Sequence, residues 1–145
     1  MGSIIISKKE KGLFIVDGQQ RLTSLTILLI FLRNLQKNRS DQVNVDELIY
    51  SEKYGVKSFN LDVDERIDCM NSLFDGFFLE ANGGTESVNN LINRYHDVEI
   101  NFPDELRAEA IPYFLDWLLE NVHLVEITAY SDDDAYTIFE TMNDR

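Results

Sequence analysis

The sequence predicts an α+β fold that is mostly helical and contains a small β-sheet. Three observations support this class. Two short β-branched runs near the start are separated by a polar stretch that ends in glycine, which is typical of a β-hairpin. The following segment repeats leucine with the 3.6-residue period of a helix. Towards the end, residues 122–129 alternate their side chains as a strand does.

The first half of the chain is expected to start with this hairpin, over Ile4–Ile6 and Leu13–Val16, joined by a charged loop. A helix should then run from Gln19 to about Lys37. Its apolar residues point in nearly every direction, which indicates a helix buried at the centre of the fold. Residues 48–61 are predicted to be irregular or to form a weak second hairpin.

The second half is expected to contain four helices and one strand. The first helix spans residues 63–78, with five apolar residues facing the core: Ile67, Met70, Leu73, Phe74 and Phe77. The second starts at Ser87 and runs to about Tyr95. The third starts at Pro103, because proline is tolerated in a first helical turn. After the strand at residues 122–129, Ser131 opens an S-x-x-D capping box, and the last helix covers Ala135 to Met142.

The length of 145 residues is enough for one domain with its own core, so a single domain over 1–145 is predicted. The longest apolar run is too short to cross a bilayer, and no membrane partner is expected. The lone Cys69 gives no internal disulfide, which favours a reducing, cytoplasmic location. Because the chain enters almost at once into a strand and stops in a helix, we expect it to be a fragment of a longer protein.

Charge is unevenly distributed along the chain. Residues 1–40 hold seven basic and two acidic residues, a net charge of +5, whereas residues 41–145 hold six basic and 24 acidic residues, a net charge of −18. An acidic body repels nucleic acid. Any contact with a polyanion is therefore expected within the first forty residues, and the remaining acids are interpreted as solvated surface.

The stretch IVDGQQRLTSL is the first candidate site, since it changes from strand to helix around Asp17, Gly18, Gln19, Gln20 and Arg21. A helix N-terminus presents unpaired N–H groups and a partial positive charge. Glycine allows the backbone to approach a ligand closely. The arginine supplies a planar fork that matches a phosphate group. The two glutamine amides are suited to orienting a water molecule.

Two interpretations of this corner remain open from the residues alone. In the first interpretation the corner binds an anion. The negative charge of Asp17 is then explained if this residue holds a divalent metal, positions a water or bonds a sugar hydroxyl. Alternatively, Asp17 as N-cap and Gln20 three residues later form an ordinary capping box, with no ligand involved.

The second candidate site is the end of the last helix, where FETMNDR gathers Glu140, Asn143, Asp144 and Arg145. Asn143 is suited either to bonding a ligand or to capping the helix. A solvated helix end is the default interpretation of charged residues in such a place. Neither histidine has a partner at metal-ligand spacing, which argues against a zinc site. The Gly83–Thr85 loop is not followed by the lysine that a P-loop requires.

GSIII, IVDGQQRLTSL and DDAYTIFETMNDR together resemble the N-terminal domain of the GmrSD-type restriction endonucleases, a large bacterial family. The resemblance covers essentially the whole chain and rests on two separated motifs in the right order. The core of that family is similar to ParB and sulfiredoxin proteins, whose equivalent glycine and arginine corner binds nucleotide phosphates. The resemblance therefore implies a ParB/sulfiredoxin-like core.

The resemblance also implies a function in defence against phage DNA. Family members are linked to NTP hydrolysis that drives or licenses the cleavage of modified DNA. Asp17, Gly18, Gln19, Gln20 and Arg21 would then form the NTP site, with Mg²⁺ on Asp17 and with Gln19 or Gln20 assisting the attack of water. Asn143 would lie near this site.

The resemblance leaves the partners of the chain open. Many relatives carry an HNH-type nuclease domain, and no HNH pattern occurs in these residues. The nuclease would then be a separate domain or subunit that brings the DNA, and exposed apolar surface would favour a homodimer. Two alternatives to an NTPase stay open, namely a non-catalytic module that binds DNA or protein, and an inactive fragment.

Overall fold

The structure, a computed structural model, describes residues 2–61 and 63–144. Helices make up 52% of the chain and strands 18%, which confirms the predicted α+β class. By its internal contacts the chain divides into two compact units. Residues 1–22 and 120–145 form one, here named the terminal unit, and residues 23–119 form the other, the central unit.

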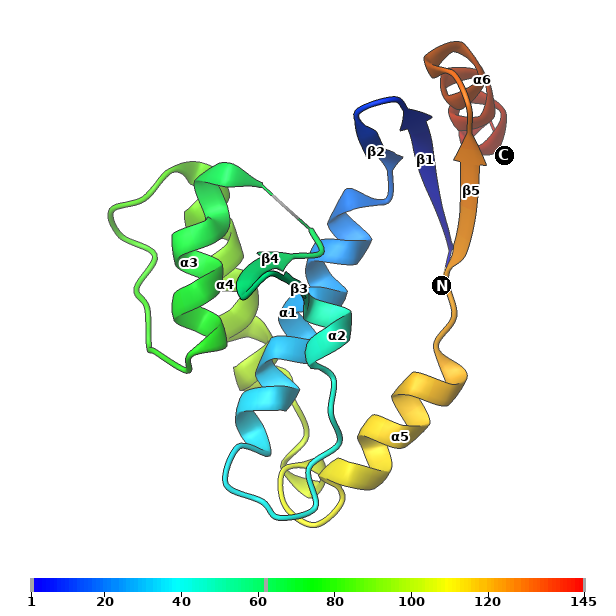
Figure 1. Cartoon of the computed structure of the whole chain (residues 1–145). Helices are drawn as coiled ribbons and strands as arrows, with labels where there is room; N and C mark the ends of the chain where they lie inside the picture. The colour runs from blue at the N-terminus through cyan, green and yellow to red at the C-terminus, as the bar shows by residue number, and fades with distance from the viewer. Residues whose placement is uncertain (1, 62, 145) are drawn as a thin grey trace. The chain divides into compact units, whose positions relative to one another are not determined.

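The terminal unit is built on a three-stranded sheet in the order β2-β1-β5 (Figure 1). The hairpin of β1 (Ser3–Lys9) and β2 (Gly12–Asp17) is antiparallel, as predicted. The strand β5 (Val125–Ala129) runs parallel to β1. It begins three residues later than the sequence predicts, because its pairing starts where Val125 lies opposite Ser3, the first residue of β1.

The helix α6 (Asp132–Asn143) packs against the three strands of this sheet. The Ser131 hydroxyl accepts a hydrogen bond from the Asp134 N–H, so the predicted N-cap is confirmed. Such a cap contributes about 1 kcal/mol to stability. The small core beneath the helix consists of buried Ile5, Ala129 and Ala135, with Ile138 and Phe139 packed against them.

Two polar contacts fix the first turn of α6 to β1. The fully buried Ser7 hydroxyl donates to Asp132 Oδ1 at 3.0 Å, and Lys9 Nζ lies 2.9 Å from Asp132 Oδ2. The hydrogen bond from Lys9 is the main cause that lowers the pKa of the Asp132 carboxyl, and the hydrogen bond from Ser7 is the second. The folded terminal unit therefore favours the ionised form of this residue.

The helix α1 (Gln19–Leu35) begins in the terminal unit and continues into the central unit from Thr23 on. Within the central unit its residues Ile27, Ile30, Phe31 and Leu32 are buried in the main core, and Leu28, Leu29 and Leu35 pack against that core. The prediction of a buried central helix is confirmed. The other elements of the central unit are α2 (Asp46–Ile49), β3 (Tyr50–Lys53), β4 (Val56–Phe59), η1 (Asp64–Arg66), α3 (Ile67–Phe74), α4 (Glu86–Asn101), η2 (Asp104–Leu106) and α5 (Ile111–Asn121).

Residues 48–61 were predicted to be irregular or to form a weak second hairpin. The structure contains the hairpin, since β3 and β4 pair as antiparallel strands. Its turn consists of Tyr54 and Gly55, and both have positive φ. Two consecutive residues of this kind are characteristic of the type I′ turn, which matches the twist of the two strands.

The helix predicted over residues 63–78 is shorter in the structure. A single 3₁₀ turn, η1, leads into α3, which ends at Phe74. Gly76 has a φ of +84°, a left-handed conformation that typically terminates a helix. Phe77 therefore lies outside the helix and is 64% exposed, so its predicted place in the core was wrong.

The helix predicted to open at Pro103 is also interrupted. Residues after Pro103 form only the 3₁₀ turn η2, and α5 starts at Ile111. The Arg107 guanidinium donates back to the carbonyl groups of Glu99 and Phe102 at the end of α4. These bonds hold Arg107, the residue that follows the turn, against the preceding helix. In contrast, α4 continues to Asn101, six residues beyond its predicted end.

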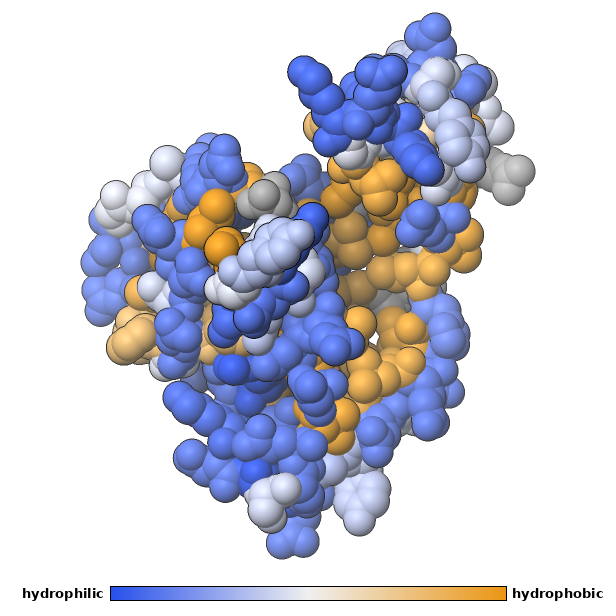
Figure 2. Space-filling view, viewed as in Figure 1, coloured by the Kyte–Doolittle hydropathy of each residue, from blue (hydrophilic) through white to orange (hydrophobic). Residues whose placement is uncertain are grey.

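The surface of the central unit that faces the viewer in Figure 2 is mostly hydrophilic, with smaller apolar patches between the charged side chains. This agrees with the high acidic content of residues 41–145. Within residues 2–61 and 63–144, no helix combines the length and the apolar character that crossing a bilayer requires.

We predict that Asp132→Asn lowers the free energy of unfolding at neutral pH. Because the folded protein lowers the pKa of Asp132, its stabilising effect is present above the ordinary aspartate pKa of about 4 and is lost as the pH falls through the lowered value. Urea unfolding of wild type and variant at several pH values down to about 3 measures this difference. The matched control is Asp133→Asn, in the same turn. A gap between wild type and Asp132→Asn that stays constant down to the lowest pH would contradict the prediction.

Candidate functional site

The predicted corner is a tight turn from β2 into α1, with Gly18 at its centre. Gly18 is buried and has a φ of +96°. A Cβ added there would lie 3.1 Å from Ile4 Cγ1 and 3.2 Å from the Ser3 carbonyl oxygen. The fold itself therefore requires glycine at this position, because both the backbone conformation and the neighbouring strand exclude a side chain. A role for Gly18 in approaching a ligand stays a prediction.

A capping box with Asp17 as N-cap would make Gly18 the first residue of the following helix. In the structure this helix, α1, starts one residue later. The Gly18 carbonyl accepts the Leu22 N–H at 3.1 Å, and the first helical residue is Gln19. Gly18 thus occupies the N-cap position, and Asp17 precedes it. Gln19 and Gln20 are exposed in the first turn of α1, at the end where the helix dipole is positive.

The Arg21 side chain lies against the start of β1. Its Nη1 donates a short hydrogen bond to the Ser3 carbonyl and lies 3.6 Å from Asp17 Oδ2. A Cβ on Gly2 would come within 3.3 Å of Arg21 Nε. The Arg21 side chain is nevertheless 43% exposed, and its contact with Asp17 is longer than a good charge-assisted hydrogen bond. Solvent and small solutes therefore have access to it.

The second motif, FETMNDR, also contacts Ser3 of β1. The Ser3 hydroxyl donates to Met142 Sδ at 3.8 Å, and Met142 is followed by Asn143, the exposed last residue of α6. Ser3 therefore contacts both Arg21 of the first motif and Met142 of the second. The structure brings the two predicted corners together within the terminal unit, with Asn143 one residue away from the contact.

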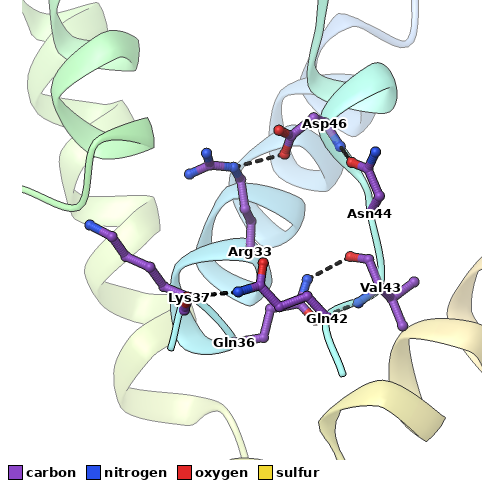
Figure 3. A pocket seen from close by; sticks show the side chains of 7 residues that line it. All are labelled: Arg33, Gln36, Lys37, Gln42, Val43, Asn44 and Asp46. Carbon is purple, nitrogen blue, oxygen red and sulfur yellow. Dashed lines mark hydrogen bonds and ion pairs between the residues drawn. The ribbon is translucent and has the colours of Figure 1, made fainter. Parts of the chain in front are cut away.

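A polar pocket that the sequence did not reveal lies in the central unit (Figure 3). It has a volume of about 270 Å³ and is formed by the last turn of α1, the segment that connects α1 to α2, and the first residue of α2. The buried Gln36 amide shapes it, because its Nε2 donates to the Val43 carbonyl at 2.6 Å and its Oε1 accepts from the Val43 N–H at 3.0 Å. Sequence reasoning assigned Gln36 only to a helix end, since its partner is set by the path of the following loop.

The arginine of this pocket, Arg33, is already bonded to other parts of the protein. Arg33 Nε donates to Asp46 Oδ1 at 2.8 Å, and its Nη1 donates to the Phe74 carbonyl at 2.9 Å. The guanidinium also stacks 3.6 Å above the Phe74 ring. These contacts hold α1 to α2 and α3, so we interpret Arg33 as a structural residue.

The described ranges 2–61 and 63–144 contain no group of three or more His, Cys, Asp or Glu residues placed to hold a metal ion. Asp17 is therefore considered as a single carboxylate ligand. This fits Mg²⁺ in nucleotide sites, which is usually bound by one or two carboxylates together with phosphate oxygens and water.

The chain matches one family model over residues 1–145, that of the GmrSD restriction endonuclease, N-terminal domain. The match covers both motifs and all elements between them. A comparison with curated proteins finds no matching relative.

We predict that Gly18→Ala destabilises the protein by about 1–3 kcal/mol, because alanine is strained at this φ and its Cβ collides with β1. Urea unfolding measures the loss. Gly83→Ala is the matched control, since no positive φ and no neighbouring atom within 4 Å oppose a side chain there. Equal stability of the two variants would contradict the steric role given to Gly18.

Proposed function

The chain belongs to the family of GmrSD restriction endonuclease N-terminal domains, and we propose that it binds and hydrolyses a nucleoside triphosphate at the Asp17–Arg21 corner. Family membership places the chain in the context of restriction and phage defence, and thus of proteins that act on DNA. Nucleotide hydrolysis would couple to cleavage by a nuclease domain or subunit.

The observation that carries the proposal is a cation in the first turn of α1. The positive end of a helix dipole favours anions and disfavours arginine, so Arg21 does not stabilise the helix it belongs to. Its nearest carboxylate, on Asp17, is 3.6 Å away and offsets this charge only in part. A phosphate group at this position would satisfy the guanidinium and the helix N-terminus together.

Asp17 and Arg21 would exchange partners when Mg²⁺ and the nucleotide bind. The carboxylate of Asp17 would take the metal ion, and the guanidinium of Arg21 would leave Asp17 for a phosphate oxygen. Both residues start partly exposed, with side chains 31% and 43% accessible, so neither has to be extracted from a core. The acid beside the anion site is explained by this exchange.

The remaining predicted residues have supporting roles in the proposal. The amides of Gln19 and Gln20 are suited to orienting the attacking water, and Gly18 fixes the turn from which they project. Asn143 would bond the nucleotide from the end of α6, next to the Met142–Ser3 contact. The ParB/sulfiredoxin-like core implied by the family resemblance also stays part of the proposal.

The test compares Arg21→Ala with Arg39→Ala in titrations with ATP and with GTP, each with Mg²⁺. Arg39 is a matched control because it also bonds one carboxylate, Asp41 at 2.9 Å, and one carbonyl, that of Ala108 at 3.0 Å, but lies in the central unit. Loss of a charge-assisted phosphate contact should raise the Kd by about 10- to 100-fold in Arg21→Ala alone. Phosphate release should fall in parallel.

Equal affinity and equal turnover in wild type and Arg21→Ala would refute the nucleotide site. A decrease of the same size in Arg39→Ala would assign the effect to general surface charge. Circular dichroism of each variant shows whether the fold is retained.

A second candidate function, a non-catalytic module that contacts DNA or a protein partner, is favoured by one observation. The tip of the β1–β2 hairpin presents exposed Lys8, in the last part of β1, and Lys11, in the loop, while Lys9 is paired with Asp132. Lysines on a protruding hairpin are suited to contacting the phosphates of a duplex without reading its sequence.

Under this second function, DNA binding should weaken as salt rises, and the slope of log K against log salt should become shallower by about 1.8 in the double variant Lys8→Ala/Lys11→Ala. Fluorescence anisotropy with a labelled duplex measures the slope. The matching variant Lys53→Ala/Lys57→Ala, on the β3–β4 hairpin, should keep the wild-type slope. A flat salt response, or no DNA binding, would favour a protein partner.

A further inference from the structure

A small pocket in the central unit is surrounded by aromatic rings. It lies between the segment that follows α3 and one face of α4, and its volume is about 90 Å³. Phe77, Phe78, Tyr95 and His96 line it. The Phe78 and His96 rings are stacked, with centroids 5.1 Å apart and planes 12° from parallel.

The early end of α3 creates this pocket. Because Gly76 terminates the helix, the two phenylalanines that follow it are not drawn into the core, and they are 64% and 74% exposed. These two aromatic side chains are consecutive in the sequence and lie in a region with many acidic residues. Their ring faces carry the negative end of the aromatic quadrupole, which attracts cations.

The charged groups around the pocket also favour a cation. Glu99 lines it directly, Asp75 and Glu80 flank the segment that forms one wall, and the whole region 41–145 is acidic. Lys37 opposes these carboxylates, with Nζ 4.0 Å from the position a Gly76 Cβ would take. Two arginines also reach these segments, Arg33 at the Phe74 carbonyl and Arg107 at the Glu99 carbonyl, and each is paired with another carboxylate, Asp46 and Asp104 respectively. The remaining charges around the pocket are three carboxylates and one ammonium, which leave the site negative.

An unused hydrogen-bond acceptor lies behind the pocket. The Asn34 amide group donates to the Leu73 carbonyl at 2.7 Å and to the Tyr95 hydroxyl at 3.1 Å, and both residues line the pocket. Asn34 Oδ1 is buried and receives no hydrogen bond from the described residues. It lies 4.0 Å from the Cβ position of Gly76, another lining residue. Asn34 does not itself line the pocket, so its contribution is to hold Leu73 and Tyr95 in place through the two hydrogen bonds that it donates.

We propose that this pocket binds the ammonium end of a lysine side chain from a partner polypeptide. The pocket is small, with a volume of about 90 Å³, and its lining combines aromatic rings, apolar side chains and one carboxylate, which suits the apolar stem and the charged end of a lysine. The apolar stem of the lysine would lie along Leu73, Phe77 and Leu79, with its charge on the rings and Glu99. This inference does not rest on the nucleotide site.

The test is a titration of the ¹³C-labelled protein with Nα-acetyl-lysine methylamide, followed by the ring signals of Phe78 and His96. A single ammonium in a partly exposed aromatic site should bind with a Kd on the order of 1–10 mM. Nα-acetyl-norleucine methylamide, which has the same stem length without the charge, should bind at least about tenfold more weakly.

Two variants assign the site, and one serves as a control. Glu99→Gln and Phe78→Ala should each weaken lysine binding by about fivefold or more, because one removes the charge and the other a ring. Both residues are at the surface, and the remaining NMR signals report that the fold is unchanged. Glu120→Gln, an exposed carboxylate near the end of α5, should bind like wild type.

Equal binding of the lysine and norleucine derivatives would overturn the proposal, since the pocket would then recognise only an apolar stem. It would also fail if no saturable shift of the Phe78 or His96 signals occurs, or if Glu99→Gln binds lysine as wild type does. None of these outcomes affects the Arg21 titration, so the two proposals fail separately.

Discussion

The terminal unit depends on the close approach of Gly18 to the first residues of β1. With φ at +96°, the chain turns from β2 into α1 while the Ser3 carbonyl and the Ile4 backbone occupy the space of a side chain. Ser3 also contacts Arg21 and Met142, which come from opposite ends of the sequence. The turn at Gly18 therefore lies against the strand residue that both motifs contact, while the pairing of β5 with β1 and the packing of α6 on the sheet bring in the second motif.

Much of this fold follows from local sequence signals, and the departures have local causes. The hairpin, the leucine-rich helix and the Ser131 cap are specified by residues close in the chain, which is why periodicity and capping rules predict them. The ends of elements are not specified in this way. The extent of β5 is set by where β1 begins, and α3 stops at Gly76 although the apolar pattern continues to Phe77. Long-range pairing and one left-handed glycine override the pattern.

The candidate site was predictable in its residues but not in its contacts. The order of acid, glycine, amides and arginine at a strand-to-helix turn indicates an anion site, because each group has a known use there. That Arg21 reaches the Ser3 carbonyl depends on the strand paired with β2, and no local rule contains this information. The pocket beside Phe78 was missed for a related reason, since the predicted helix continued to residue 78 and Phe77 was assigned to its buried face.

The central claim is that Arg21 exchanges its contacts with Asp17 and Ser3 for a phosphate group. A crystal structure of the protein with a non-hydrolysable nucleoside triphosphate and Mg²⁺ tests it most directly. The claim predicts an Arg21 nitrogen about 2.7–2.9 Å from a phosphate oxygen, with Asp17 in the coordination sphere of the metal. A nucleotide bound elsewhere, with Arg21 still on the Ser3 carbonyl, would contradict it.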